Sequence, residues 1–176
     1  MSYIRRELSK EDTEILNKIY NELEKINIPT TYRSKCVKGR YHPERTGTCN
    51  QKRARQTPFG IVTYRHKKKV SNSTKKYPWI MPLFKEFIQS HYPEFEFQTV
   101  YVNKNTVVKK HLDANNVGES LLVGFGSYTG GQTTLYLQDE TQSFDINTSS
   151  IIFNGSQIYH QSEPFEGTRY SLVFYN

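Results

Sequence analysis

Apolar residues recur at helical spacing in the first part of the chain. Ser9 and Asp12 have the spacing of a capping box, which marks the start of a helix. Apolar positions then follow at intervals of three and four residues as far as about Ile26, and Pro29 closes the segment. These positions are Ile15, Leu16, Ile19, Tyr20 and Leu23. The pattern predicts a helix with one apolar face.

A second helix is predicted to end near His91. Pro78 suits its first turn, because proline needs no backbone hydrogen-bond acceptor there. Its apolar face comprises Ile80, Leu83, Phe84, Phe87 and Ile88. Between the two helices, residues 32–57 are polar and lack periodicity, so we expect mostly loop. Residues 59–64 predict a strand, and residues 66–76 predict a charged loop.

From Phe95 onward the pattern changes to short β-type runs separated by Asn, Gly, Asp and Ser. The runs cover residues 95–103, 106–113, 120–128, 132–138, 149–154, 157–162 and 169–175. Strands at this spacing after two helices predict a mainly β barrel or sandwich buttressed by N-terminal helices. We expect a single domain over residues 1–176. In it, residues 1–94 provide helical support and a basic, substrate-facing segment, and residues 95–176 form the β core.

One segment differs sharply in charge from the rest of the chain. The protein has a net charge of +7, and residues 32–76 hold 14 Lys and Arg with one acidic residue, Glu44. Aromatic residues are interspersed among these cations: Tyr32, Tyr41, Phe59, Tyr64 and Tyr77. Cations interleaved with rings can neutralise phosphates and stack on bases, so the segment predicts contact with DNA or RNA. A solvated insertion is the alternative interpretation.

The cysteines and the absence of long apolar runs indicate the cellular compartment in which we expect the protein. Cys36 and Cys49 occur without a signal-peptide pattern, so reduced intracellular thiols are expected. A zinc site formed with His42 is less favoured, because no CxxC spacing supports it. No run of 18 apolar residues occurs, so we expect no membrane span and a cytoplasmic or nuclear protein.

The strongest candidate chemistry begins where His111 and Asp113 stand one residue apart. In a strand, side chains two positions apart share a face, so both can point at one ion. His160 follows the apolar run 149–154, where an antiparallel fold can return to the first motif. Two imidazoles and one carboxylate form the facial triad of non-haem Fe(II) oxygenases. Taken alone the His-x-Asp pair is a weak signal, because a surface ion pair explains it equally well.

The last apolar run adds a candidate anion site. Residues 163–167, "EPFEG", predict a turn that places His160 and Arg169 near each other across two antiparallel strands. Arg169 and Ser171 share one face of the last strand. The other face carries Tyr170, Leu172 and Phe174. An inward arginine needs an anion, and its planar fork suits a carboxylate. Alternatively, Arg169 pairs with an internal Asp or Glu, or it is exposed at the start of the strand. Because the candidate triad lies nearby, we favour a small dicarboxylate ligand.

Five of these residues together follow a pattern known from one enzyme superfamily. They are His111, Asp113, His160, Arg169 and Ser171. The pattern resembles the 2-oxoglutarate/Fe(II)-dependent dioxygenases, and the Gly130-Gly131 pair agrees with it. Residues 169–175, "RYSLVFY", are similar to the last core strand of the TET 5-methylcytosine dioxygenases. Residues 113–131 are similar to the region after the metal motif in TET and J-base-binding-protein (JBP) thymidine hydroxylases.

This resemblance implies a fold, two cofactors and a role for each of the five residues. The implied fold is a double-stranded β-helix, a jelly-roll or cupin-like barrel, supported by the N-terminal helices. His111, Asp113 and His160 would be the catalytic ligands of Fe(II). Arg169 and Ser171 would bind the distal carboxylate of 2-oxoglutarate. The implied reaction oxidises a substrate while 2-oxoglutarate is converted to succinate and CO2.

The substrate is less closely defined by the sequence. We favour hydroxylation or demethylation of a nucleic-acid base, such as a methylated pyrimidine, because of the basic segment and the TET-like runs. Tyr101 and Asn103 are candidates for contacting 2-oxoglutarate or substrate. Candidate substrate contacts are Lys52, Arg53, Arg55, Arg65, Asn115 and Asn116. A protein side chain, such as proline, or a small molecule is the alternative, because the chain lacks a cysteine-rich zinc region. A non-catalytic, polyanion-binding β-barrel is the third hypothesis.

Overall fold

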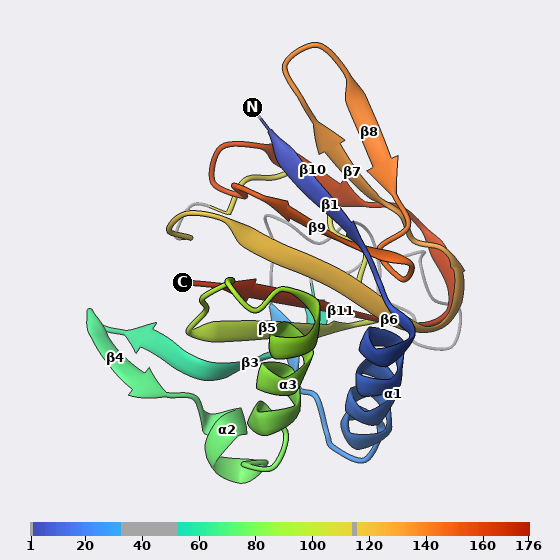
Figure 1. Cartoon of the computed structure of the whole chain (residues 1–176). Helices are drawn as coiled ribbons and strands as arrows, with labels where there is room; N and C mark the ends of the chain where they lie inside the picture. Colours follow the sequence, from blue (N-terminus) through green and yellow to red (C-terminus); the bar gives the residue numbers. More distant parts are fainter. Residues whose placement is uncertain (1, 33–52, 114–115) are drawn as a thin grey trace.

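The computed structural model describes residues 2–32, 53–113 and 116–176 (Figure 1). Eight strands form the main sheet in the order β1-β9-β6-β11-β5-β3-β2, with β4 paired to β3, and every pairing is antiparallel. The strands of this sheet are β1 (Tyr3–Glu7), β2 (Thr30–Tyr32), β3 (Arg53–Tyr64), β4 (Lys67–Val70), β5 (Thr99–Lys104), β6 (Ser120–Gly130), β9 (Ser149–Phe153) and β11 (Phe165–Tyr175). A second sheet has the order β10-β7-β8. Its strands are β7 (Thr133–Tyr136), β8 (Thr141–Phe144) and β10 (Tyr159–Ser162).

Two helices lie side by side against the main sheet (Figure 1). α1 (Lys10–Glu24) begins at the predicted capping box: Ser9 Oγ accepts from the Asp12 N–H, and the Asp12 carboxylate accepts from the Ser9 N–H. α3 (Met81–His91) ends where predicted but begins later. Pro82 occupies its first turn, whereas Pro78 lies in the preceding turn, so the role predicted for Pro78 is wrong. None of the helices in the described ranges is long and apolar enough to cross a membrane.

The last strand, β11, divides the interior as its sequence predicts. Tyr170, Leu172 and Phe174 belong to the buried cluster between the sheet and the helices. Full burial of one such side chain stabilises the fold by about 1.5–3 kcal/mol. Arg169 and Ser171 face the other way, into a pocket on the opposite side of the sheet. The alternation of side chains along one strand therefore separates the apolar core from the polar pocket.

Two segments predicted as loop are ordered into strands and a short helix. β3 begins at Arg53, although the periodicity of its first half is weak. This half is held by pairing with β5, in a register that runs from Arg55 opposite Lys104 to Gly60 opposite Thr99. The charged run 66–76 contains β4 and α2 (Asn72–Lys76). Arg65 and His66 connect β3 to β4, with φ values of 49° and 64°. A two-residue hairpin turn requires this backbone conformation, which glycine or asparagine usually signals.

Other local predictions also need correction. Residues 106–113 do not form a strand; their pairing includes one isolated bridge, between His111 and His160. β1 and β8 were not predicted. The candidate zinc residues Cys36, His42 and Cys49 lie outside the described residues.

Candidate active site

A pocket of about 510 Å³ opens on the face of the main sheet that points away from the helices. Its walls come from both sheets: β3, β5, β6 and β11 on one side, and β7 and β10 on the other. The segment before β6 completes the lining with His111 and Asp113. This volume falls within the roughly 300–1,000 Å³ that is typical of small-ligand sites.

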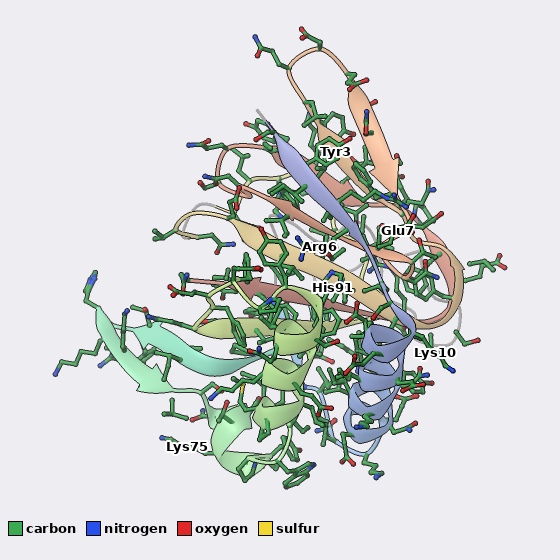
Figure 2. The ribbon with its side chains drawn as sticks, in the orientation of Figure 1. Tyr3, Arg6, Glu7, Lys10, Lys75 and His91 are labelled. Carbon is green, nitrogen blue, oxygen red and sulfur yellow. The ribbon has the colours of Figure 1, made fainter. Side chains whose placement is uncertain are left out.

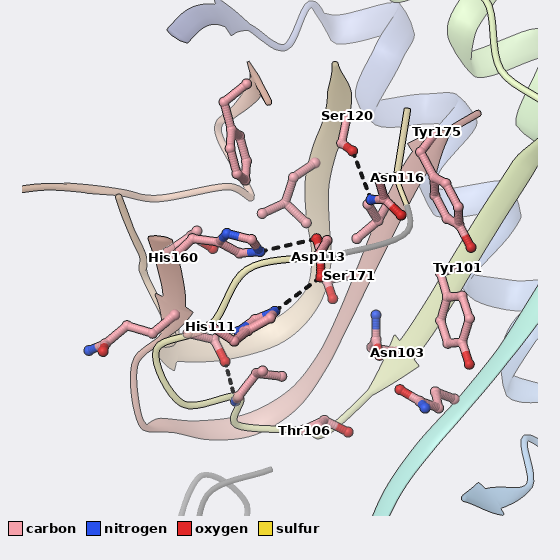
Figure 3. Close-up of a pocket in the computed structure, with 18 of the residues that line it drawn as sticks. Tyr101, Asn103, Thr106, His111, Asp113, Asn116, Ser120, His160, Ser171 and Tyr175 are labelled. Carbon is pink, nitrogen blue, oxygen red and sulfur yellow. Dashed lines mark hydrogen bonds and ion pairs between the residues drawn. The ribbon is translucent and has the colours of Figure 1, made fainter. Parts of the chain in front are cut away.

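His111, Asp113 and His160 meet in this pocket (Figure 3). The Nε2 atom of His111 lies 3.2 Å from Asp113 Oδ1, and the Nε2 atom of His160 lies 3.2 Å from Asp113 Oδ2. The two imidazole centroids are 4.3 Å apart. One ligand atom from each residue lies within 4.8 Å of the others, so the three could bind a single ion.

The backbone brings these three side chains together without the strand that the sequence predicted around Asp113. His111 and His160 exchange backbone hydrogen bonds of 3.0 and 3.1 Å, and the Asp113 N–H donates to Gly155 O at 2.9 Å. A Cβ atom at Gly155 would lie 2.9 Å from Asp113 Oδ2. The carboxylate therefore reaches the two imidazoles because the chain turns around it and because residue 155 has no side chain.

The hydrogen bonds of the two imidazoles fix which nitrogen faces the carboxylate. His111 Nδ1 donates to Lys109 O at 2.7 Å, and His160 Nδ1 donates to Ile158 O at 2.8 Å. Since a carbonyl can only accept, the Nε2 atom of each neutral ring carries a lone pair directed at Asp113. Lone pairs facing a carboxylate require a cation or a proton between them. Two imidazole nitrogens and a carboxylate oxygen, with both Nδ1 atoms anchored to carbonyls, fit a divalent iron ion.

The electrostatics of Asp113 agree with a site built for a cation. Burial alone raises the pKa of this carboxyl group. Without a metal ion, a proton on each Nε2 lets His111 and His160 donate hydrogen bonds and bring positive charge, which outweigh the effect of burial. The pKa of Asp113 is held well below its ordinary value as a result. The carboxylate is therefore ionised and available as a ligand at neutral pH.

Arg169 enters the same pocket from β11 and is only 3% exposed. Its Nε donates to Gly131 O at 3.1 Å, and its guanidinium carbon lies 5.7 Å from the centroid of the Tyr128 ring. Among the described residues, no carboxylate forms an ion pair with it. Burial lowers the pKa of Arg169, because the charged form loses solvation. A buried guanidinium without a carboxylate of its own is suited to bind an anionic ligand.

The predicted relation between His160 and Arg169 is wrong in its details. "EPFEG" is mostly strand, because β11 begins at Phe165 and only Glu163 and Pro164 separate it from β10. β10 pairs with β7, whereas β11 pairs with β5 and β6. His160 and Arg169 therefore lie on different sheets and face one pocket from its two walls.

Polar side chains cross the main-sheet wall in one row. Gln56 of β3 is paired in register with Asn103 of β5, which is paired in turn with Ser171 of β11. All three line the pocket. Tyr101 and Tyr175 lie beside this row, and Figure 3 shows their rings next to each other. The wall thus combines amide groups, a hydroxyl group and aromatic rings within reach of one ligand.

The candidate substrate contacts are divided by the structure. Asn116 lines the pocket and donates to Ser120 Oγ at 3.2 Å. Arg55 and Arg65 do not line it; Arg65 lies in the turn between β3 and β4. Lys52, Asn115 and the side chain of Arg53 lie outside what the structure describes.

Several pocket residues were missed by sequence analysis. Gln56 was assigned to a loop, because the predicted strand began only at residue 59. The observed strand begins at Arg53, and alternation along it places Gln56 on the same face as Pro58. Tyr175 follows Arg169 and Ser171 at the same spacing, so alternation could have identified it. Thr133 and Ser162 carry no such signal, because their positions depend on how the second sheet folds over the first.

Comparison with solved structures shows which fold this is. An oxidoreductase of the 2OG-Fe(II) oxygenase family from Burkholderia pseudomallei matches with a TM-score of 0.65 and 14% identity, over 98% of this chain and 84% of that chain. NgTET1 in complex with 5mC DNA matches with a TM-score of 0.62 and 13% identity, over 98% of this chain and 70% of that chain. A prolyl hydroxylase from Trichoplax adhaerens, in complex with a hypoxia inducible factor oxygen degradation domain peptide fragment, matches with a TM-score of 0.57 and 14% identity, over 99% and 81%.

These similarities confirm the predicted fold, the double-stranded β-helix of the 2-oxoglutarate oxygenases with supporting helices. At such identities they concern the fold alone. The fold is common to the TET protein and the prolyl hydroxylase, so it does not distinguish a DNA substrate from a peptide substrate. No protein-family model matches the chain. No curated protein matches its sequence either.

Proposed function

We propose that this protein is a 2-oxoglutarate- and Fe(II)-dependent dioxygenase. One observation carries the proposal: two imidazoles and a carboxylate converge in the same pocket as a buried arginine that has no carboxylate partner among the described residues. A facial triad leaves coordination positions open for a chelating ligand and for oxygen. An arginine in the same pocket provides the second anchor that a dicarboxylate needs. The double-stranded β-helix fold supports this combination.

Each residue of the pocket has a distinct task in this proposal. His111, Asp113 and His160 would hold Fe(II), which supplies redox chemistry for the oxidation of substrate when it is bound. Arg169 binds the distal carboxylate of 2-oxoglutarate, and Ser171 donates a further hydrogen bond to it. The carbonyls of Lys109 and Ile158 keep both imidazoles in the tautomer that presents Nε2.

The substrate that we propose is a nucleic-acid base, with a methylated pyrimidine as the leading case. Tyr101 and Tyr175 offer aromatic faces for stacking, and Gln56, Asn103 and Asn116 offer amide groups for hydrogen bonds to the edge of a base. A base in a duplex must leave the stack to enter such a pocket. The lysine-rich strand β4 gives the protein a surface that can bind phosphates. The fold shared with NgTET1 is compatible with this substrate.

A single incubation tests the reaction and the substrate separately. The protein, Fe(II) and 2-oxoglutarate are mixed with a pool of methylated DNA, methylated RNA and proline-containing peptides. We expect succinate to form and one nucleic-acid pool to gain an oxygen atom or lose a methyl group, as measured by mass spectrometry. Oxidised peptides with unchanged nucleic acids would replace the substrate and keep the reaction. A lack of succinate with every pool would rule out the oxygenase.

A further inference from the structure

The hairpin formed by β3 and β4 extends beyond the body of the molecule (Figure 1). Every residue from Thr63 to Val70 is exposed, so this part of the ribbon has no packing role that its side chains would serve. In Figure 2 its side chains extend outward on both sides of the ribbon. Its base is firmly held, because β3 pairs with β5 and the Gly60 N–H donates to Thr74 Oγ1 at 2.7 Å. The hairpin is thus an exposed arm on a fixed support.

The hairpin carries several cations and no acidic residue of its own. Arg65, Lys67, Lys68 and Lys69 lie within seven consecutive residues, 64–70, that include no Asp or Glu. None of these cations forms an ion pair with a described carboxylate, and Lys68 Nζ donates instead to the neutral Gln98 side chain at 3.1 Å. Cations kept together without a carboxylate partner repel one another, so a bound polyanion would relieve this repulsion.

The cations lie on both faces of the ribbon. Lys67 and Lys69 share a face with Tyr64, because Lys67 is paired with Tyr64 in register and Lys69 Nζ lies 4.7 Å from the Tyr64 ring centroid. Lys68 points to the other face, as alternation requires. An acidic protein surface would contact one face of such a ribbon. A nucleic-acid groove has phosphates on both sides, so it can contact both faces of the ribbon at once. The major groove of DNA, about 12 Å wide, admits a two-stranded ribbon.

The length of β3 sets how far the hairpin lies from the pocket. Gln56 lines the pocket, and Tyr64 ends the strand eight residues later. At about 3.3 Å per residue, the separation along the strand is at most about 26 Å. A duplex rises about 3.4 Å per base pair, so the hairpin reaches phosphates up to about eight base pairs from the base in the pocket.

We infer that the β3–β4 hairpin is a duplex-binding arm, which inserts into a groove of the nucleic acid and holds its phosphates while the pocket takes a base within about eight base pairs. This inference rests on the proposed function for the identity of the base. The binding itself depends on Lys67, Lys68 and Lys69, with Tyr64 packing on the sugars or bases between the phosphates. Tyr64 is 55% exposed, so its ring can be reached from solvent although Arg65 and Lys69 lie over it.

The test measures the affinity of the full-length protein for a fluorescent duplex of about 24 base pairs, long enough to span the pocket and the arm at the reach given above. In the variant Lys67→Ala/Lys68→Ala/Lys69→Ala, we expect the Kd at about 0.1 M salt to rise about 10- to 100-fold. The slope of log Kd against log salt should fall by about three, nearly one for each lysine. These side chains are exposed, so circular dichroism should show an unchanged fold.

A matched control removes the same charge from another surface. Lys10, Lys18 and Lys85 are exposed on α1 and α3. If Lys10→Ala/Lys18→Ala/Lys85→Ala weakens binding as much as the hairpin variant, net charge rather than the arm explains the affinity, and the inference is wrong. The inference also fails if polyglutamate binds as tightly as the duplex and loses its affinity in the hairpin variant, because the arm would then recognise acidic protein.

Substrate geometry gives a second measurement. Duplexes carry the modified base about 4, about 8 or about 12 base pairs from their nearer end, around the reach given by the rise per base pair. We expect wild-type binding to strengthen until the flank reaches about eight base pairs, and the hairpin variant to lose this dependence. A wild-type affinity that ignores flank length overturns the inference. The affinity and salt-slope measurement above needs neither turnover nor a base in the pocket, so the arm can pass that test even if no base is oxidised and the proposed substrate fails.

Discussion

Among the described residues, histidine lies beside aspartate at two sites, and the second ring nitrogen has a different partner at each. At the first, where α1, α3 and β9 meet, His91 Nδ1 lies 2.8 Å from Asp12 Oδ2, and His91 Nε2 lies 2.6 Å from Ser150 Oγ. Both ring nitrogens are therefore occupied by protein groups. The three side chains are buried, with Ser150 at 0% exposure, so this Ser-His-Asp arrangement is a brace that no substrate can reach.

The brace closes a junction of the fold. Asp12 also caps α1 through the Ser9 N–H and accepts from Ser90 Oγ at 2.7 Å. Arg6 of β1 donates to the carbonyl of His91 at 3.1 Å, and Figure 2 shows these two labelled residues near each other. Every polar group named here has a partner. A closed network of this kind contributes to stability and offers nothing to a metal ion.

At the pocket, His111 and His160 use only Nδ1 for the protein, and both Nε2 atoms face the same carboxylate. The residue types are the same as in the brace. What differs is the partner of Nε2. In His91 this nitrogen meets the Ser150 hydroxyl, whereas in His111 and His160 it faces the Asp113 carboxylate, so that a cation or a proton must lie between them. This difference in partner is the reason why we propose a ligand site at the pocket and not at the brace.

The largest expected effect comes from removing a ligand of the pocket. His111→Ala or Asp113→Ala should reduce succinate formation by more than about 100-fold, since loss of a mere supporting group around a metal costs about 10- to 100-fold. The melting temperature should stay close to that of the wild type, because neither residue belongs to the apolar core. Turnover within a few-fold of wild type in either variant would contradict the ligand assignment.

The brace should respond in the opposite way. Asp12→Ala leaves Nδ1 of His91 without its partner and removes the capping-box carboxylate at the start of α1, so we expect a loss of about 3–5 kcal/mol in the free energy of unfolding. Denaturant titration measures this loss. In the fraction that remains folded, the KM for 2-oxoglutarate should not change. A large change in KM with little loss of stability would show that the two sites are not separate.

Arg169→Ala should act mainly on the affinity for 2-oxoglutarate. The loss of a charge-assisted hydrogen bond, about 1.5–3 kcal/mol, corresponds to a KM increase of roughly 10- to 100-fold. Steady-state assays at saturating Fe(II) separate KM from kcat. Arg169→Lys, which keeps the charge and loses the fork, should fall between the wild type and Arg169→Ala. An unchanged KM in Arg169→Ala would assign the distal carboxylate to another residue.

The smallest expected effect is on how the free energy of unfolding depends on pH, and it concerns Asp12 of the brace. Burial raises the pKa of Asp12, but hydrogen bonds from Ser9, Ser90 and His91 outweigh it, so the pKa lies below its ordinary value of 3.8. The ionised carboxylate therefore stabilises the fold above about pH 4, and this contribution is lost as the pH falls through the lowered pKa. Asp12→Asn, which keeps an oxygen for the cap, should lack this acid-side loss when unfolding is measured from about pH 7 to about pH 3. Identical pH profiles would exclude Asp12 as its source.

The candidate site illustrates how far local pattern extends. Alternation correctly assigned Arg169 and Ser171 to one face of β11, and the same rule would have found Tyr175. Alternation also predicted that His111 and Asp113 lie close together because they share one face of a strand, and this reason is wrong. The two side chains meet because the backbone turns between them and because residue 155 is a glycine. Both outcomes have one cause. Alternation describes a regular strand, and residues 106–113 are not one.

Local patterns were enough to predict the capping box that starts α1, the apolar faces of both helices and the two faces of β11. The sequence also pointed to His111, Asp113 and His160, which meet in the pocket. Contacts between distant segments explain why the carbonyls of Lys109 and Ile158 orient the imidazoles of His111 and His160, whereas the Ser150 hydroxyl occupies Nε2 of His91. A periodic pattern of side chains in the sequence depends only on residues that are close along the chain, so it predicts helices, strands and their faces. The atom that a ring nitrogen meets depends on which distant segment folds against it.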